Sequence, residues 1–144
     1  MKSMKFSFLA VVALLFSGAA LEASAALAII AHPSNKLSGI SAEDAAHLFL
    51  GKTGEFSNGQ RATPVHQAGN SPARGKFLKS VLKKDEDELT AYWSKLQFSG
   101  KGQPPRDLAD DAAVKAFVVG NPDAIGYVDG KFVDGSVKVL LIIP

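Results

Sequence analysis

Short apolar runs alternate with segments of helical periodicity between residues 27 and 143, and this alternation is the strongest constraint on the fold. Short, continuous apolar runs are typical of buried strands. Strands are expected at 27–31, 62–66, 124–128 and 137–143. Helices are expected to begin at or near Ser41, Ser71, Asp85 and Asp110. Strands that alternate with helices predict an α/β domain with a largely parallel sheet flanked by helices.

The same periodicity identifies the side chains expected in the core. These residues lie on the apolar faces of the predicted helices or within the predicted strands: Ile29, Leu48, Phe49, Phe77, Leu78, Trp93, Val118, Ile125 and Leu140. Four aromatic residues, Tyr92, Trp93, Phe98 and Phe117, also recur at helical spacing. This spacing favours packing in the core over an exposed aromatic binding platform.

The first 25 residues have the three-part layout of a secretory signal peptide. Lys2 and Lys5 precede an apolar run at 6–16, and Ala23-Ser24-Ala25 forms a small-x-small cleavage site. An apolar run of about 11 residues is too short to span a bilayer, which needs roughly 20. We therefore expect cleavage after Ala25, export to the periplasm, and a single domain at 26–144 without stable membrane insertion.

Charge and cysteine content exclude several classes of partner. The chain has 16 basic and 14 acidic residues. Without Lys2, Lys5 and Glu22 the remainder has 14 and 13, a net charge of +1. Such a balance gives no electrostatic support to nucleic-acid binding. The absence of cysteine excludes disulfides and thiolate metal sites.

The three histidines give no support to a metal site either. His32, His47 and His66 are scattered without ligand spacing, and residues of this kind are expected at the surface or in caps. The acidic run 85–88 is typical of a solvated first helical turn and not of a metal loop. No nucleophile motif or phosphate-binding loop is present. We therefore expect no cofactor, no metal and no enzymatic activity.

The most informative motif is the segment 69–74, Gly-Asn-Ser-Pro-Ala-Arg, which follows a predicted strand and opens a helix. The unpaired N–H groups at a helix N-terminus favour an anion. The Ser71 hydroxyl and the N–H groups of Ala73 and Arg74 could donate to an oxyanion, and the Arg74 guanidinium could clamp it. Gln67 and Asn70 are expected to complete the rim. The same pattern is also that of an ordinary helix cap followed by a solvated arginine.

Four motifs in order resemble the periplasmic phosphate-binding proteins of ABC-type uptake systems. They are Leu-Phe-Leu-Gly-Lys at 48–52, the segment 69–74, Trp93 with Phe-Ser-Gly-Lys-Gly at 98–102, and Ala-Ile-Gly-Tyr-Val at 124–128. The resemblance covers residues 27 to about 140 and is closest to short, stand-alone members. It implies a periplasmic-binding-protein-like fold of about one lobe.

The resemblance also implies that Ser71 corresponds to the first residue of the Ser-Gly-Thr phosphate cradle of the full-length family. Three residues depart from that pattern. Pro72 stands at the glycine and lacks an N–H donor. Ala73 stands at the threonine, and Gln67 stands where the larger proteins carry an arginine that contacts phosphate.

Two functions remain open from the sequence. The first is a non-enzymatic periplasmic module that binds phosphate or a similar oxyanion weakly at Ser71, Ala73 and Arg74. The alternative is an interaction or adaptor protein on a lobe-like scaffold that has lost ligand capture and docks on a membrane sensor, a transporter or a second subunit. Ser71 and Arg74 favour the first, and Pro72 and Gln67 favour the alternative.

Overall fold

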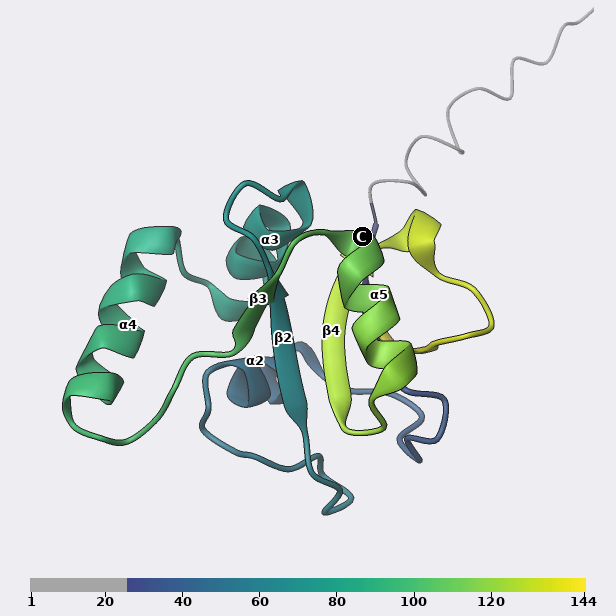
Figure 1. Cartoon of the computed structure of the whole chain (residues 1–144), viewed down its shortest axis with the longest axis horizontal. Helices are drawn as coiled ribbons and strands as arrows, with labels where there is room; N and C mark the ends of the chain where they lie inside the picture. The colour runs from purple at the N-terminus through teal and green to yellow at the C-terminus, as the bar shows by residue number, and fades with distance from the viewer. Residues whose placement is uncertain (1–25) are drawn as a thin grey trace, which may run out of the picture.

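The computed structural model describes residues 26–144, which form a five-stranded sheet with helices on both faces (Figure 1). The predicted signal peptide at 1–25 lies outside the described residues. The elements in chain order are β1 (Leu27–Ala31), α2 (Ala42–Phe49), β2 (Thr63–Gln67), α3 (Pro72–Phe77), the π-helical turn η1 (Leu78–Leu82), α4 (Glu86–Phe98), β3 (Arg106–Leu108), α5 (Asp111–Gly120), β4 (Ala124–Asp129), the 3₁₀ turn η2 (Gly130–Phe132) and β5 (Lys138–Ile143).

The sheet is mixed, which corrects the expectation of a largely parallel one. Its order is β3-β2-β4-β1-β5. β2 runs parallel to β3 and to β4, whereas β1 runs antiparallel to both β4 and β5. The alternation of strands and helices could not show this, because the partners of β1 come from the far end of the chain. Leu27, for example, pairs with Asp129 and with Ile143.

The core has two layers, one on each face of the sheet. Along β1, Leu27 and Ile29 face one layer while Ala28 and Ile30 face the other. The larger layer lies under α2, α3, η1 and α4, and the smaller one lies under α5. In Figure 1, α5 crosses in front of the sheet and α2 lies behind it. Successive side chains of β1 therefore alternate between the two layers, as expected for a strand buried on both faces.

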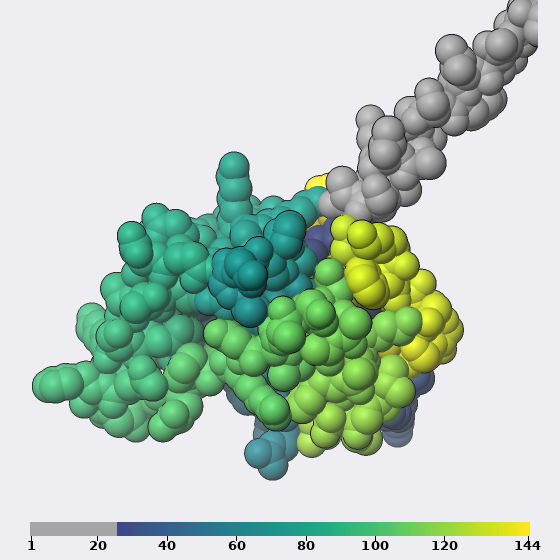
Figure 2. Space-filling model, turned by 45° about the horizontal axis from the view of Figure 1, so that its top comes forward, coloured from purple at the N-terminus to yellow at the C-terminus, as the bar shows by residue number. Residues whose placement is uncertain are grey.

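All nine residues predicted for the core are buried, so that prediction is confirmed. Phe98 is the clear exception among the aromatic residues assigned to packing, because its side chain is 98% exposed. It is the last residue of α4, which stands beside the edge strand β3 and projects from the body of the domain (Figure 2). The end of that helix extends past the core, so helical spacing alone gave the wrong environment for Phe98.

Local sequence signals fix the helix ends near the candidate site. The Ser41 side chain accepts a hydrogen bond from the Asp44 N–H at 3.0 Å and caps α2. Asp85 and Glu88 form a reciprocal capping box at the start of α4. Gly51, after α2, has a φ of 67°, and a Cβ there would lie 3.0 Å from the Trp93 ring.

Within residues 26–144, no helix has the length and apolar character needed to cross a membrane.

Candidate binding site

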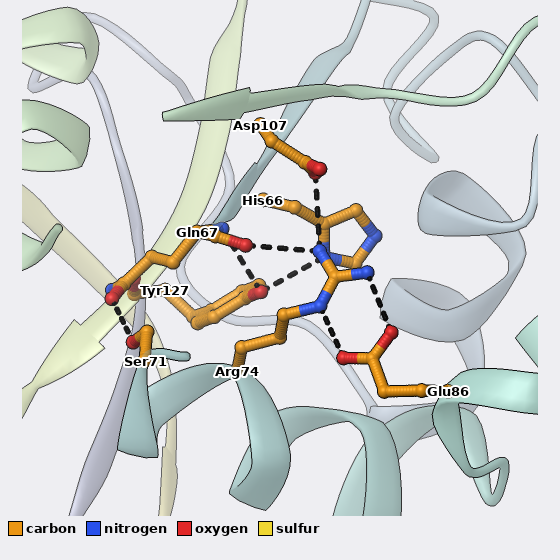
Figure 3. Close-up of polar contacts among 7 residues, drawn as sticks. All are labelled: His66, Gln67, Ser71, Arg74, Glu86, Asp107 and Tyr127. Atoms are coloured by element: carbon orange, nitrogen blue, oxygen red, sulfur yellow. Dashed lines mark hydrogen bonds and ion pairs between the residues drawn. The ribbon is translucent and has the colours of Figure 1, made fainter. Parts of the chain in front are cut away.

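The predicted oxyanion residues meet where β2 ends and α3 begins (Figure 3). Ser71 is the N-cap residue of α3, and Pro72 occupies the first turn as the sequence predicts. Ser71 does not cap the helix with its side chain, however. Its hydroxyl instead donates a hydrogen bond to Gln67 Oε1 on the last residue of β2. The serine and the glutamine therefore bind each other across the turn.

The Gln67 side chain is fully buried, and both ends of its amide have partners. Nε2 donates to Asp111 Oδ1 at 2.9 Å and to the Tyr127 carbonyl oxygen at 2.8 Å. The same oxygen of Asp111 also accepts the Asp129 N–H at 2.8 Å. This set of bonds links the end of β2 to the start of α5 and to β4. Gln67 consequently acts as a structural bridge at the position that the resemblance assigns to a phosphate-contacting arginine.

Arg74 is buried to 8% exposure and holds its guanidinium among carboxylates. Nε and Nη2 donate to the two oxygens of Glu86 at 2.6 and 3.0 Å, a bidentate ion pair. Nη1 donates to Asp107 Oδ1 at 3.1 Å and to the Gln67 carbonyl oxygen at 2.9 Å. The hydrogen bonds that Arg74 donates to Glu86 raise the pKa of Arg74 above its ordinary value, and the negative charge of Asp107 adds to that effect. Four of the five guanidinium N–H groups are thus already donated.

His66 lies beneath this cluster and is buried, which corrects the expectation that it lies at the surface or in a cap. Its ring packs against Phe49, Phe77 and Tyr127. His66 Nδ1 is 2.8 Å from the Tyr127 hydroxyl oxygen. The same oxygen accepts a hydrogen bond from the Gln67 N–H at 3.1 Å. Burial lowers the pKa of His66 to about 3, and the positive charge of Arg74 acts in the same direction. The imidazole is therefore neutral near pH 7.

The remaining predicted residues lie at the entrance to α3. Ala73 is buried, and Asn70 is exposed on the turn before the helix. The N–H groups of Ala73 and Arg74 belong to the first helical turn, where the helix itself offers no acceptor. The structure therefore brings Gln67, Ser71 and Arg74 together. It directs the Arg74 side chain to Glu86 and Asp107 instead of leaving it solvated.

Four residues of the cluster were not predicted from sequence: Glu86, Asp107, Asp111 and Tyr127. Three of them are acids in segments that read locally as helix starts or as a loop, and the fold brings them to β2 from distant parts of the chain. A buried arginine requires carboxylate partners, so the burial of Arg74 would have been the signal. Nothing in the sequence, however, indicated that Arg74 would be buried.

The electrostatics of the cluster oppose an anion beside the guanidinium. One positive charge on Arg74 faces two carboxylates, those of Glu86 and Asp107. An oxyanion would have to displace Glu86 from its bidentate pair or lie next to it uncompensated. Among the described residues, no group of three or more His, Cys, Asp or Glu side chains could hold a metal ion. The arrangement supports a rigid polar junction between β2, α3, α4 and β3.

Comparison with known proteins identifies the fold. No family model and no curated protein sequence matches this chain. Solved structures do match. A protein from Clostridium perfringens, assigned to phosphate ABC transporters as a substrate-binding protein and solved with phosphate bound, has a TM-score of 0.63 at 21% identity. An ABC-type phosphate transport receptor from Vibrio cholerae has a TM-score of 0.62 at 19% identity. PstS from Borrelia burgdorferi has a TM-score of 0.59 at 14% identity.

These matches cover most of this chain but only part of each solved protein. They extend over 81%, 79% and 83% of this chain and over 45%, 44% and 51% of the C. perfringens, V. cholerae and B. burgdorferi proteins. The chain thus spans about half of their length or less. The sequence resemblance is confirmed at the level of fold, which is that of one lobe of a periplasmic binding protein.

Proposed function

We propose that this chain is a non-enzymatic periplasmic module that acts by docking on a membrane sensor, a transporter or a second subunit. One observation supports this over phosphate capture: the polar side chains at the position of the cradle bind one another. Arg74 is paired with Glu86 and Asp107, and Gln67 is bonded to Ser71 and Asp111. A site with satisfied hydrogen bonds and an excess of carboxylates offers little to an incoming anion.

The size of the domain supports the same proposal. Two-lobed binding proteins close on a ligand and exclude water from its charged contacts. The similar structures are about twice as long as the matching part of this chain. A single lobe leaves a bound anion in contact with solvent, where each charged contact contributes less. Docking on another protein is a function that one lobe can perform without a second.

A second candidate function is weak binding of phosphate or a related oxyanion at the first turn of α3. It is favoured by the uncapped start of that helix, because Ser71 makes no side-chain bond to the first-turn N–H groups. Ala73 and Arg74 would supply backbone donors, and the exposed Asn70 and the Ser71 hydroxyl would complete the site with Gln67 at its rim. The structural likeness to a protein with bound phosphate also favours it.

Calorimetric titration with phosphate and sulfate separates the two candidates. Docking without ligand capture predicts no saturable heat at about 1 mM anion, which corresponds to a binding free energy of about 4 kcal/mol. Oxyanion binding predicts saturation between micromolar and millimolar concentration. It also predicts a loss of about tenfold in Arg74→Ala, because that change leaves the carboxylates of Glu86 and Asp107 uncompensated beside the anion. Saturable phosphate binding that Arg74→Ala weakens would replace the first proposal by the second.

Docking itself is tested by photo-crosslinking in the periplasm. A crosslinking residue at position 98 replaces an aromatic side chain that is 98% exposed, and one at position 119 on α5 provides a control on the other layer. We expect position 98 to form one discrete adduct with a membrane protein, because exposed aromatic side chains are enriched at interfaces. Position 98 is the last residue of α4, so this adduct would place the docking surface at the end of that helix. Equal, diffuse labelling from positions 98 and 119 would contradict docking there.

A further inference from the structure

A cavity of about 280 Å³ lies between α4 and the edge strand β3, next to the polar cluster. Its apolar walls come from Leu89, Trp93 and the Pro104-Pro105 pair. Its polar lining includes His66, Arg74 and Asp107. The volume is near the lower end of the roughly 300–1,000 Å³ typical of small-molecule sites. Arg74 also lines this cavity, whereas Ser71 and Ala73 do not, so the cavity adjoins the predicted oxyanion site without including the first turn of α3.

Two residues that line this cavity each carry a buried nitrogen without a hydrogen-bond partner among the described residues. The nitrogens are His66 Nε2, on a side chain 2% exposed, and Trp93 Nε1, on a side chain 6% exposed. Buried polar groups in folded proteins are almost always hydrogen-bonded, so each one needs an explanation. Both residues line the same cavity, and a single bound molecule could therefore serve both.

The hydrogen bonds of Tyr127 identify the His66 nitrogen as a donor. The Tyr127 oxygen accepts the Gln67 N–H, and its own hydrogen then has His66 Nδ1 as acceptor at 2.8 Å. A neutral imidazole with an acceptor at Nδ1 carries its proton on Nε2. Figure 3 shows His66 Nε2 on the side of the imidazole ring away from Tyr127. The indole Nε1 of Trp93 is also a donor only, so the cavity has two unsatisfied donors.

The surrounding charges determine what kind of acceptor fits. Asp107 uses Oδ1 to accept from Arg74, and the two carboxylates of Asp107 and Glu86 outnumber the one guanidinium. The cluster therefore has no net positive charge that would attract an anionic ligand. An amide group has the complementary pattern, because its carbonyl oxygen accepts two hydrogen bonds and its N–H can donate to the second oxygen of Asp107.

We propose that the cavity between α4 and β3 binds a small, uncharged amide, whose carbonyl oxygen accepts from His66 Nε2 and Trp93 Nε1. The apolar part of the ligand packs on the indole ring and on Pro104-Pro105. The amide site does not depend on either function proposed above, although Arg74 and Gln97 on its wall place it next to both.

The test follows the side-chain N–H resonances of His66 and Trp93 in the purified, ¹⁵N-labelled protein. The probe is N-acetylglycinamide, with sodium acetate and inorganic phosphate as charged comparators. We expect saturable shifts of both resonances with a dissociation constant on the order of 1 mM, which is reasonable for a probe of about eight non-hydrogen atoms. Acetate and phosphate should leave both resonances in place. Phosphate binding at α3 would shift backbone N–H signals there and leave these two unchanged, which separates the two sites.

Two variants and one control complete the test. His66→Phe retains an aromatic ring but removes the donor, and Ser94→Phe fills the cavity from an exposed position on α4. Each should weaken amide binding by about tenfold or more, read at the Trp93 indole. His47→Phe makes the same substitution on α2, away from the cavity, and should bind as the parent does. If the amide produces no saturable shift up to about 20 mM, the two donors bond only to water and the proposal is wrong. Shifts that His66→Phe and Ser94→Phe both leave unchanged would equally overturn it.

Discussion

Lowering the pH from 7 to 5 should destabilise the protein because of His66. Its imidazole is buried among Phe49, Phe77 and Tyr127, and burial lowers its pKa to about 3 in the folded chain. In the unfolded chain the pKa returns to 6.5. Between these two values the unfolded state binds the proton and the folded state does not. The free energy of unfolding therefore decreases as the pH falls below 6.5.

The size of the effect follows from the two pKa values. At pH 5 the unfolded histidine is almost fully protonated, 1.5 pH units below its pKa, while the folded one is still neutral. Each unit corresponds to about 1.4 kcal/mol, so the protein should lose about 2 kcal/mol between pH 7 and pH 5. That is a large part of the stability of a small domain. Asp134, whose pKa is lowered by hydrogen bonds from Lys115 and Ser136, affects stability only at more acidic pH.

Urea denaturation at several pH values measures this loss. Trp93 is the only tryptophan and is buried, so its fluorescence reports unfolding directly. His66→Gln should be less stable than the parent at pH 7 but should lose about 2 kcal/mol less on acidification, because the titrating group is absent. His47→Gln retains His66 and should keep the parental dependence on pH. Equal stability of the parent at pH 5 and 7, or the same pH dependence in His66→Gln, would refute the reasoning.

Three further predictions concern packing, the polar cluster and processing. Gly126→Ala should lower the free energy of unfolding by about 1–3 kcal/mol, because a Cβ there would lie 2.6 Å from a methyl group of Val114 on α5. Gly75→Ala has open space around it and should raise the free energy of unfolding by about 0.5–1 kcal/mol. Thermal unfolding of the two variants measures both changes. Asp111→Ala removes one acceptor of Gln67 Nε2 and the acceptor of the Asp129 N–H, and it should cost about 1–3 kcal/mol by urea denaturation. Unchanged stability would contradict a structural role for these two bonds. Intact-mass measurement on a periplasmic extract should give a chain that begins at Ala26, and a full-length, membrane-retained species would contradict export.

The sequence predicted the composition of the core better than the direction of its strands. Ile29 and Trp93 are buried as their apolar periodicity indicates, because burial depends on the local pattern. The direction of β1 depends on which strands flank it, and those strands come from the other end of the chain. β3 was missed because its three residues follow the Pro104-Pro105 break and show no apolar alternation.

The candidate site was predicted in position but not in bonding. Ser71 and Pro72 open α3 as expected, and Gln67 lies next to Ser71. The partners of Arg74 could not be predicted, because Glu86 reads locally as part of an acidic first turn and Asp107 as part of a polar loop. A local pattern shows that a charged residue is present, whereas only the tertiary fold decides which opposite charge it meets.

The antiparallel pairing of β1 also affects the order in which the domain can assemble. β1 is synthesised first, yet its neighbours β4 and β5 occupy Ala124–Asp129 and Lys138–Ile143. The central ladder of the sheet therefore cannot form until nearly all of the chain is available, and such long-range pairing is intrinsically slow. Until then the apolar segment Leu27–Ala31 has neither neighbour and is prone to associate with other chains. The export predicted from the sequence would require an unfolded chain, and this delay would keep the domain open until its last strand has arrived.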